Sequence, residues 1–401
     1  MILLSGAAIV LPDRILEFAT LVVEGTRIAQ ILSGPRSVDA RATHIDARGH
    51  YVVPGFIDVH VHGIRGTDTL DGEDAIGTIA RRLPRHGVTA FCPTSVACAP
   101  GALRAMLAAV RQARLERPVG AARVLPAHLE SNFINPDFTG AQPVECLRRP
   151  WAAPPAGEFS GADILAEIAA ARPDVGIVTL APEIEGGMDL VRDLAKHGHR
   201  VSLGHSGATY AQAIEAIEAG AVHATHLFNR MARLDHRAPG LAGAVLTREE
   251  VAAEIICDGV HVHPAMVRMA VAAKRPSGVL AITDGTAGSG FPPGTVASLG
   301  GRRITVGDLA RLDDGTIAGS VLTMDRAFVN LVTIMGFSLI DAAIMCSTTP
   351  ARALGLHGFG AIAPGAVADL VVLDRDLQVV HTIIGGELVS PASASTSTPG
   401  D

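Results

Sequence analysis

The two ends of the chain share one pattern of apolar and polar residues, and the middle has another. Residues 1–53 contain short apolar runs rich in β-branched residues, such as TLVVEGTRIAQIL, with turn residues between them. Residues 359–390 repeat this pattern in ADLVVLDRDLQVVHTIIGGELV. Such runs are typical of β-strands, so we expect both ends to pair into one small sheet domain. The small polar residues 391–401 predict a disordered tail.

The segment between them, residues 54–358, alternates short apolar runs with stretches of helical spacing such as TYAQAIEAIEAG. Eight such pairs predict a (β/α)8 barrel of the TIM type, which is an α/β fold. The rival is a doubly wound open sheet, and it is disfavoured because no G-x-G-x-x-G follows an apolar run. The expected strands lie within residues 55–63, 87–95, 122–130, 175–183, 199–206, 221–229, 251–259 and 278–285.

Histidine and carboxylate residues stand at the carboxyl ends of five of these runs. In a barrel those ends meet at one mouth, where active sites are built. The sequence therefore predicts that separate segments bring imidazoles and carboxylates into one small volume. The residues are His60 and His62, Glu130, His205, His226 and Asp284.

The residue types in this group indicate a metal site. His60 and His62 point to the same face of a strand, because residues i and i+2 do so. Each of the other residues also has a possible structural role without a metal. Glu130 could form an ion pair with an arginine, Asp284 could belong to a turn, and a single histidine could be a hydrogen-bonded core residue. Together they suit one or two divalent ions, with zinc expected before iron, manganese or cobalt. Such an ion lowers the pKa of bound water to about 7, and Asp284 is the candidate to accept the proton of that water.

Composition and charge exclude other functions. The chain has 401 residues, 33 basic against 40 acidic side chains and a net charge of −7, so nothing marks a nucleic-acid footprint. The five cysteines form no C-x-x-C pair, which argues against a thiolate site and favours a reducing compartment. The start MILLSGAAIVLPDR lacks the features of a signal peptide, and the apolar stretch 327–340 is too short to span a bilayer. We expect a cytoplasmic protein that binds neither nucleic acid nor membrane.

A series of short motifs runs along the chain from about Pro54 to Leu373. In order, they are PGFIDVHVHG, HLE, GHS, THLFN, PGLAGA, DGVHV, TDG and DGTIAGSVLTMDRA. The H-x-H motif alone is typical of the amidohydrolase superfamily. The full set, and THLFN with PGLAGA and DGVHV above all, resembles the N-acetylglucosamine-6-phosphate deacetylases of that superfamily. The resemblance implies a barrel with a small β-sandwich made from both chain termini, and a phosphorylated amino sugar as substrate.

The same resemblance implies roles for single residues. A main metal would be held by Glu130, His205 and His226, and a second metal by His60 and His62, with Glu130 bridging the two. Asp284 would be the catalytic acid and base. The sugar phosphate would be bound by His261, Asn229 and Arg237, with Arg237 supplied by the partner subunit of a homodimer.

Three departures from the family pattern lie near the expected substrate. Ser131 and Asn132 replace a Gly-Pro pair, Gln142 stands where a carbonyl-polarising histidine is usual, and Arg230 stands where alanine is usual. Gln142 and Arg230 are therefore candidate substrate-binding residues. The departures leave three functions open: a deacetylase of an amino-sugar 6-phosphate, an amidohydrolase acting on another anionic N-acyl or cyclic amide, and a non-enzymatic paralogue.

Overall fold

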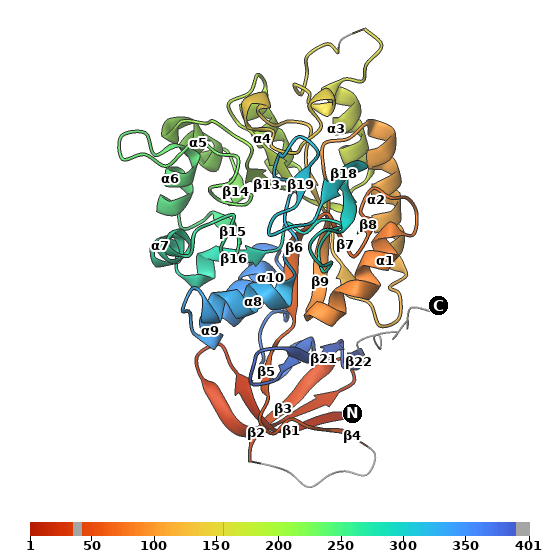
Figure 1. Ribbon diagram of the computed structural model, residues 1–401, viewed down its shortest axis with the longest axis vertical. Coiled ribbons are helices and arrows are strands. Elements are labelled where there is room, and N and C mark those ends of the chain that lie inside the picture. The colour runs from red at the N-terminus through yellow and green to blue at the C-terminus, as the bar shows by residue number, and fades with distance from the viewer. Residues whose placement is uncertain (35–41, 155, 390–401) are drawn as a thin grey trace.

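Eight parallel strands in the middle of the chain form a nearly closed barrel, which confirms the predicted fold class (Figure 1). The computed structural model describes residues 1–34, 42–154 and 156–389, so the tail expected at 391–401 lies outside the described residues. Each strand falls within one of the eight apolar runs and is mostly buried. The strands are β6 (Phe56–Val61), β9 (Val88–Ser95), β11 (Ala127–Glu130), β12 (Val175–Leu180), β13 (Arg200–Leu203), β14 (Ala221–Ala224), β15 (Ala252–Ile256) and β16 (Val279–Ile282).

Helices surround the barrel (Figure 1). Their apolar faces turn toward the strands, as in α4, where Leu190 and Leu194 are buried because residues four apart share a helix face. Ser160 and Asp163 form a capping box that satisfies free backbone amides at the start of α3. Within the described ranges, no helix is long and apolar enough to cross a membrane. The helices are α1 (Ala75–Arg82), α2 (Pro100–Leu115), α3 (Gly161–Ala170), α4 (Gly187–Lys196), α5 (Tyr210–Glu218), α6 (Gly240–Thr247), α7 (Pro264–Lys274), α8 (Met324–Thr333), α9 (Leu339–Ala343) and α10 (Thr349–Ala353).

The first and last strands of the barrel, β6 and β16, meet at its mouth. The backbone N–H of His62 donates to Gly285 O at 2.8 Å, and that of Asp284 donates to His60 O at 3.0 Å. Val61 and Gly285 form a parallel bridge at the same point. The closure of the barrel therefore brings polar residues from the two strand ends into contact.

The two ends of the chain form a second, mixed sheet below the barrel, as predicted (Figure 1). β5 pairs antiparallel with β20 and parallel with β1. Leu4, Leu21, Val52, Leu370 and Ile383 contribute to a core that is separate from the core of the barrel. The exact domain limits at residues 53 and 358 stay a prediction. The strands of this sheet are β1 (Ile2–Val10), β2 (Ile15–Glu24), β3 (Arg27–Ser33), β4 (Thr43–Asp46), β5 (Tyr51–Pro54), β20 (Leu370–Leu373), β21 (Val379–Ile384) and β22 (Glu387–Val389).

A small three-stranded sheet follows β16 and contributes to the wall of the barrel mouth. It consists of β17 (Val296–Leu299), β18 (Arg302–Thr305) and β19 (Arg311–Leu312). Leu299, with Ile317 and Gly319 just beyond the sheet, lines the cavity described below. The sheet has its own apolar contacts, in which Ile304 packs with Val96.

Candidate active site

Three of the predicted site residues follow their strands with an unusual backbone conformation. His205, His226 and Asp284 have φ angles of 48°, 30° and 50°, and each lies two residues after its strand ends. This left-handed region costs a residue with a side chain roughly 1–3 kcal/mol. All three side chains line one cavity. Strain of this kind persists where the surrounding structure enforces it, and it is typical of functional sites.

Glu130, the last residue of β11, lies at the centre of the group. Its Oε1 is 2.7 Å from His205 Nε2 and 2.8 Å from His226 Nε2. Its Oε2 is 3.4 Å from His62 Nε2 and accepts a hydrogen bond from Gln142 Nε2. The residue is only 3% exposed, and a carboxylate at that depth is stable only with such compensation.

His60 and His62 form a second group beside Glu130. Their Nε2 atoms are 3.2 Å apart, and they lie 3.4 Å and 3.3 Å, respectively, from Asp284 Oδ1. His60 Nε2 is also 4.0 Å from Glu130 Oε1. The two rings of the H-x-H motif therefore face the same space, between the two carboxylates.

The direction of the ring nitrogens tests whether these residues fit a metal. His205 Nδ1 is 2.7 Å from the carbonyl oxygen of Phe138, which can only accept, so this nitrogen carries the proton. The lone pair of His205 Nε2 then faces Glu130 and His226 Nε2, 3.1 Å away. Lone pairs and carboxylates that converge in this way need either protons or a metal ion between them.

The ligand atoms also lie close enough for that cation. Glu130, His205 and His226 place theirs within 4.8 Å of one another, and so do His60, His62 and Glu130. Imidazole and carboxylate are ligands of divalent transition metals. The residues present therefore fit one or two divalent ions.

Without an ion, the carboxylates hold protons on the imidazoles. Burial by itself lowers the pKa of a histidine, but Asp284 and Glu130 outweigh burial at His62 and raise its pKa to about 10. In the same way, Glu130 outweighs burial at His226 and raises its pKa to about 9.

The pKa values of the two carboxyls move the other way. Burial raises the pKa of Glu130, but the histidines, His205 first, hold it well below its ordinary value. Burial also opposes ionisation of Asp284, but His60 and then His62 keep its pKa lowered. An incoming ion must therefore displace protons from the imidazoles.

A cavity of about 500 Å³ opens over this group. Two predicted residues do not line it. His60 is fully buried, and Arg237 lies in the exposed segment 233–238. The predicted residues that line the cavity are His62, Glu130, Gln142, His205, His226, Asn229, Arg230, His261 and Asp284.

Three of the lining residues offer polar atoms to a ligand. Asn229 Nδ2 and His261 Nε2 are buried and have no hydrogen-bond partner in the part of the chain that the structure describes. The side chain of Arg230 lies over Gly140, where an added Cβ would be 2.6 Å from Arg230 Nε. Buried polar atoms are rarely left without partners, so this wall suits a polar ligand.

A polar layer that was not predicted from the sequence lies beneath the site. Glu254 of β15 is fully buried and accepts hydrogen bonds from His60 Nδ1 and His223 Nε2, both at 2.9 Å. Asp58 of β6 accepts from Thr283 Oγ1 at 2.6 Å, and burial raises its pKa to about 7. The available signal was a charged residue inside each apolar run, VAAEIICDG and GFIDVHVHG.

A family described as the amidohydrolase family matches residues 51–389. The chain belongs to the amidohydrolase family. This amidohydrolase is 35% identical to the N-acetylgalactosamine-6-phosphate deacetylase of Escherichia coli O157:H7, over 91% of this chain and 94% of that protein. It is 37% identical to the N-acetylglucosamine-6-phosphate deacetylase of Homo sapiens, over 87% and 86% of the two chains.

Solved structures agree with these relatives. The N-acetylglucosamine-6-phosphate deacetylase of Thermotoga maritima superposes with a TM-score of 0.83 at 32% identity, covering 97% of this amidohydrolase and 99% of that chain. A variant of the Mycobacterium smegmatis enzyme, in complex with N-acetyl-D-glucosamine-6-phosphate, superposes with a TM-score of 0.85 at 32% identity and the same coverage.

The site geometry predicts that metal binding is coupled to proton release. We expect exhaustive chelation to abolish turnover. Calorimetric titration of the metal-free protein with Zn²⁺, in two buffers of different ionisation enthalpy, should show that protons are released at about pH 7 when the ion binds. The apparent affinity for the metal should rise with pH, because protons compete with the ion for the two imidazoles. The pKa of His62 is about 10 and that of His226 is about 9. His205→Ala should lose the main ion and His60→Ala mainly the second. Full activity after chelation, or binding without proton release, would contradict this.

Proposed function

We propose that this amidohydrolase hydrolyses the N-acetyl amide of an amino-sugar 6-phosphate, releasing acetate and the free amino-sugar phosphate. The observation that carries the proposal is a single cavity that joins the imidazoles around Glu130 to unpaired polar atoms of Asn229 and His261. One end suits a cation and the other an anionic ligand. The relatives named above are called deacetylases of such sugar phosphates.

We assign the main ion to Glu130, His205 and His226, and a second ion to His60 and His62, with Glu130 shared. Zinc is the first choice because it binds imidazole and carboxylate together, and iron, manganese or cobalt accept the same ligands. A bound ion supplies a Lewis acid for the acetyl carbonyl and lowers the pKa of water.

Asp284 is the group we assign to proton transfer, from the attacking water to the leaving amine. Its carboxylate is held ionised, because the neighbouring imidazoles lower its pKa against burial. Its position is fixed at both ends of the residue: its N–H donates to His60 O at 3.0 Å, and its carbonyl accepts from Ser320 N at 2.7 Å. The side chain can therefore exchange a proton without moving the backbone.

Gln142 is the group we assign to the acetyl oxygen. Its Nε2 donates one hydrogen bond to Glu130, and an amide nitrogen carries two protons, which leaves the second N–H for the substrate. Asn132 donates to the carbonyl oxygens of Cys98 and Cys146 at 2.8 Å and 2.7 Å. These bonds tie down both ends of the loop that carries Gln142. A neutral donor that is held in place in this way can stabilise developing negative charge.

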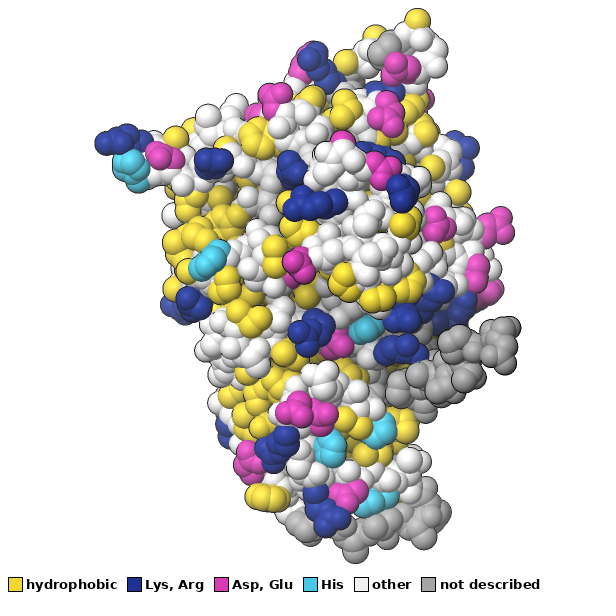
Figure 2. Space-filling view, viewed as in Figure 1, with side chains coloured by type: hydrophobic (Ala, Val, Ile, Leu, Met, Phe, Trp, Pro, Cys, Tyr) yellow, Lys and Arg dark blue, Asp and Glu magenta, His cyan; other side chains and the backbone are white. Residues whose placement is uncertain are grey.

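We place Arg237 in the cavity of a partner subunit, where it would bind the phosphate together with Arg230, Asn229 and His261. Its segment, 233–238, is exposed, and the loop before α6 projects from the barrel (Figure 1). Figure 2 shows apolar side chains gathered over α6 and α7 on this side of the molecule, and Leu234 and Met269 are among the exposed large apolar residues. The assembly we propose is a cytoplasmic homodimer.

The sugar epimer is a separate part of the proposal. We name N-acetylglucosamine-6-phosphate first, and its galacto epimer is the alternative because a deacetylase of that sugar phosphate is among the similar proteins. Arg230 in the cavity wall favours a second candidate as well, since an added guanidinium suits other anionic N-acyl or cyclic amides.

A panel of N-acetyl amino sugars tests this proposal directly. The metal-loaded enzyme should release acetate from N-acetylglucosamine-6-phosphate or N-acetylgalactosamine-6-phosphate with a kcat/KM far above that for the unphosphorylated sugars. The reason is that the polar atoms of Asn229 and His261 lose their partner when the phosphate is absent. Equal kcat/KM values with and without phosphate would remove the phosphate from the substrate and leave the other anionic amides.

Asp284→Asn tests the proton transfer. The substitution keeps the shape of the side chain but cannot accept a proton, so kcat should fall by roughly 10²–10⁴. The bound metal, measured by elemental analysis, should remain, since Glu130 and the histidines are unchanged. A variant with near wild-type kcat would assign the role of base to another residue.

Arg237 and Asp284 together test the shared site. Arg237→Lys should raise KM for the phosphorylated substrate and leave an unphosphorylated analogue almost unaffected, because lysine cannot form the bidentate contact. Mixing Arg237→Ala with Asp284→Asn should form heterodimers with one intact site and recover part of the activity. No recovery after verified subunit exchange would place Arg237 outside the partner's cavity.

A further inference from the structure

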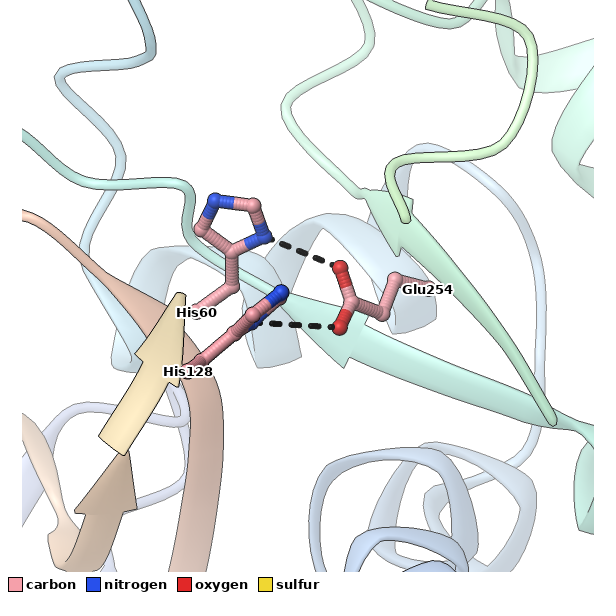
Figure 3. A group of neighbouring side chains, drawn as sticks. All are labelled: His60, His128 and Glu254. Carbon is pink, nitrogen blue, oxygen red and sulfur yellow. Dashed lines mark hydrogen bonds and ion pairs between the residues drawn. The ribbon is translucent and has the colours of Figure 1, made fainter. Parts of the chain in front are cut away.

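Glu254 is a fully buried carboxylate beneath the candidate metal site (Figure 3). Its Oε2 is 2.9 Å from His60 Nδ1 and 3.3 Å from the backbone N–H of His226. Its Oε1 is 2.9 Å from His223 Nε2 and 3.7 Å from His128 Nδ1. Imidazoles and a backbone amide, and no arginine or lysine of the described chain, surround this carboxylate.

A carboxylate in a barrel interior is costly, and an apolar residue would fill the same space without that cost. The contact with His60 has a consequence that an apolar residue cannot provide. An ionised carboxylate only accepts hydrogen bonds, so His60 Nδ1 must carry the proton. The lone pair of His60 Nε2 then faces His62 Nε2 at 3.2 Å and the carboxylates of Asp284 and Glu130.

A separate ion between Glu254, His60 and His128 is a rival explanation, because their ligand atoms lie within 4.8 Å of one another. His128 argues against it. Its Nδ1 is 3.0 Å from the carbonyl oxygen of Val59 and therefore carries a proton, and its Nε2 is 2.7 Å from Thr179 Oγ1. Neither nitrogen of His128 is available as a ligand beside Glu254.

We propose that Glu254 is a positioning residue, which fixes the tautomer and ring direction of His60 and thereby strengthens the second cation position formed by His60 and His62. The hydrogen bond from the backbone of His226 links the same carboxylate to the strand end of the main position. The effect on the second ion is selective because, among the candidate metal ligands, Glu254 bonds the side chain of His60 and only the backbone N–H of His226. This inference rests on the proposed function for its two cation positions.

Glu254→Gln tests the inference, since it removes the charge and keeps the volume. Metal-free wild type and variant are titrated with Co²⁺ alone, by calorimetry and by the visible absorption of the bound ion. We expect two ions in the wild type. In the variant, the first should bind as in wild type and the second about 10–100-fold more weakly, the usual effect of losing a partner of a metal-bound histidine. Ser202→Ala is the matched control, because Ser202 is equally buried and bonds Thr225 at 2.6 Å, away from Glu254.

The control should bind both ions as the wild type does, and metal-free Glu254→Gln should unfold as one cooperative unit. Glu254→Asp, which withdraws the carboxylate from His60, should give an intermediate affinity for the second ion. If Glu254→Gln does not fold, Glu254→Asp is the variant that tests the inference. An unchanged second ion, equal weakening of both ions, or the same loss in Ser202→Ala would overturn the inference.

The titration and the substrate panel separate this inference from the proposed function. A wild type that binds only one ion would overturn the role of Glu254 and leave a one-metal deacetylase standing. A wild type that binds two ions but deacetylates no sugar phosphate would overturn the proposed function. The selective loss in Glu254→Gln would then still support the positioning role.

Discussion

The structure of the site depends on one buried carboxylate, Glu130. At 3% exposure, it is stable only if its surroundings supply positive charge, and they do so through His205 and His226 at 2.7 Å and 2.8 Å. These donors come from strands far apart in the chain, so the carboxylate is compensated only when the barrel is closed. The same geometry suits a cation. Without an ion, protons on the imidazoles compensate the charge of the carboxylates, and these protons must leave when an ion binds.

The barrel interior below this site is polar where apolar layers are usual, and hydrogen bonds satisfy it from strand to strand. His128 bonds Thr179 at 2.7 Å, and Thr225 bonds both Thr179 and Ser202 at 2.6 Å. Each of these side chains has its donors and acceptors set by its neighbours, and a fully satisfied network of this kind is rigid. The left-handed backbone at His205 and His226 has direct partners of its own, because the N–H of Asn135 donates to His205 O at 3.0 Å and the N–H of Asn229 donates to His226 O at 2.9 Å.

The sequence predicts most of this arrangement because it follows from two periodic rules. Apolar runs alternating with helical stretches predict the barrel, and the carboxyl ends of the runs predict which residues meet. Glu254 was missed because a single acidic residue inside an apolar run carries no period of its own, and its partner His60 lies far from it in the chain. The left-handed conformations of His205 and Asp284 were not predicted either, because the enrichment of His and Asp in that region is too weak to identify single positions in a sequence.

The residues in which this chain departs from the family pattern lie apart from the residues that surround the cation position. The residues around the cation position end strands or directly follow them, and the polar layer below supports them. Gln142 and Arg230 lie on loops, and Arg230 contacts the cavity wall at Gly140 rather than the strands. Loops accept changes that a closed barrel does not. In the function we propose, the strand-end residues hold the ions and transfer the proton, whereas loop residues contact the substrate, Gln142 at the acetyl oxygen and Arg230 at the anionic group. The departures of this chain from the family pattern therefore lie where the substrate would bind.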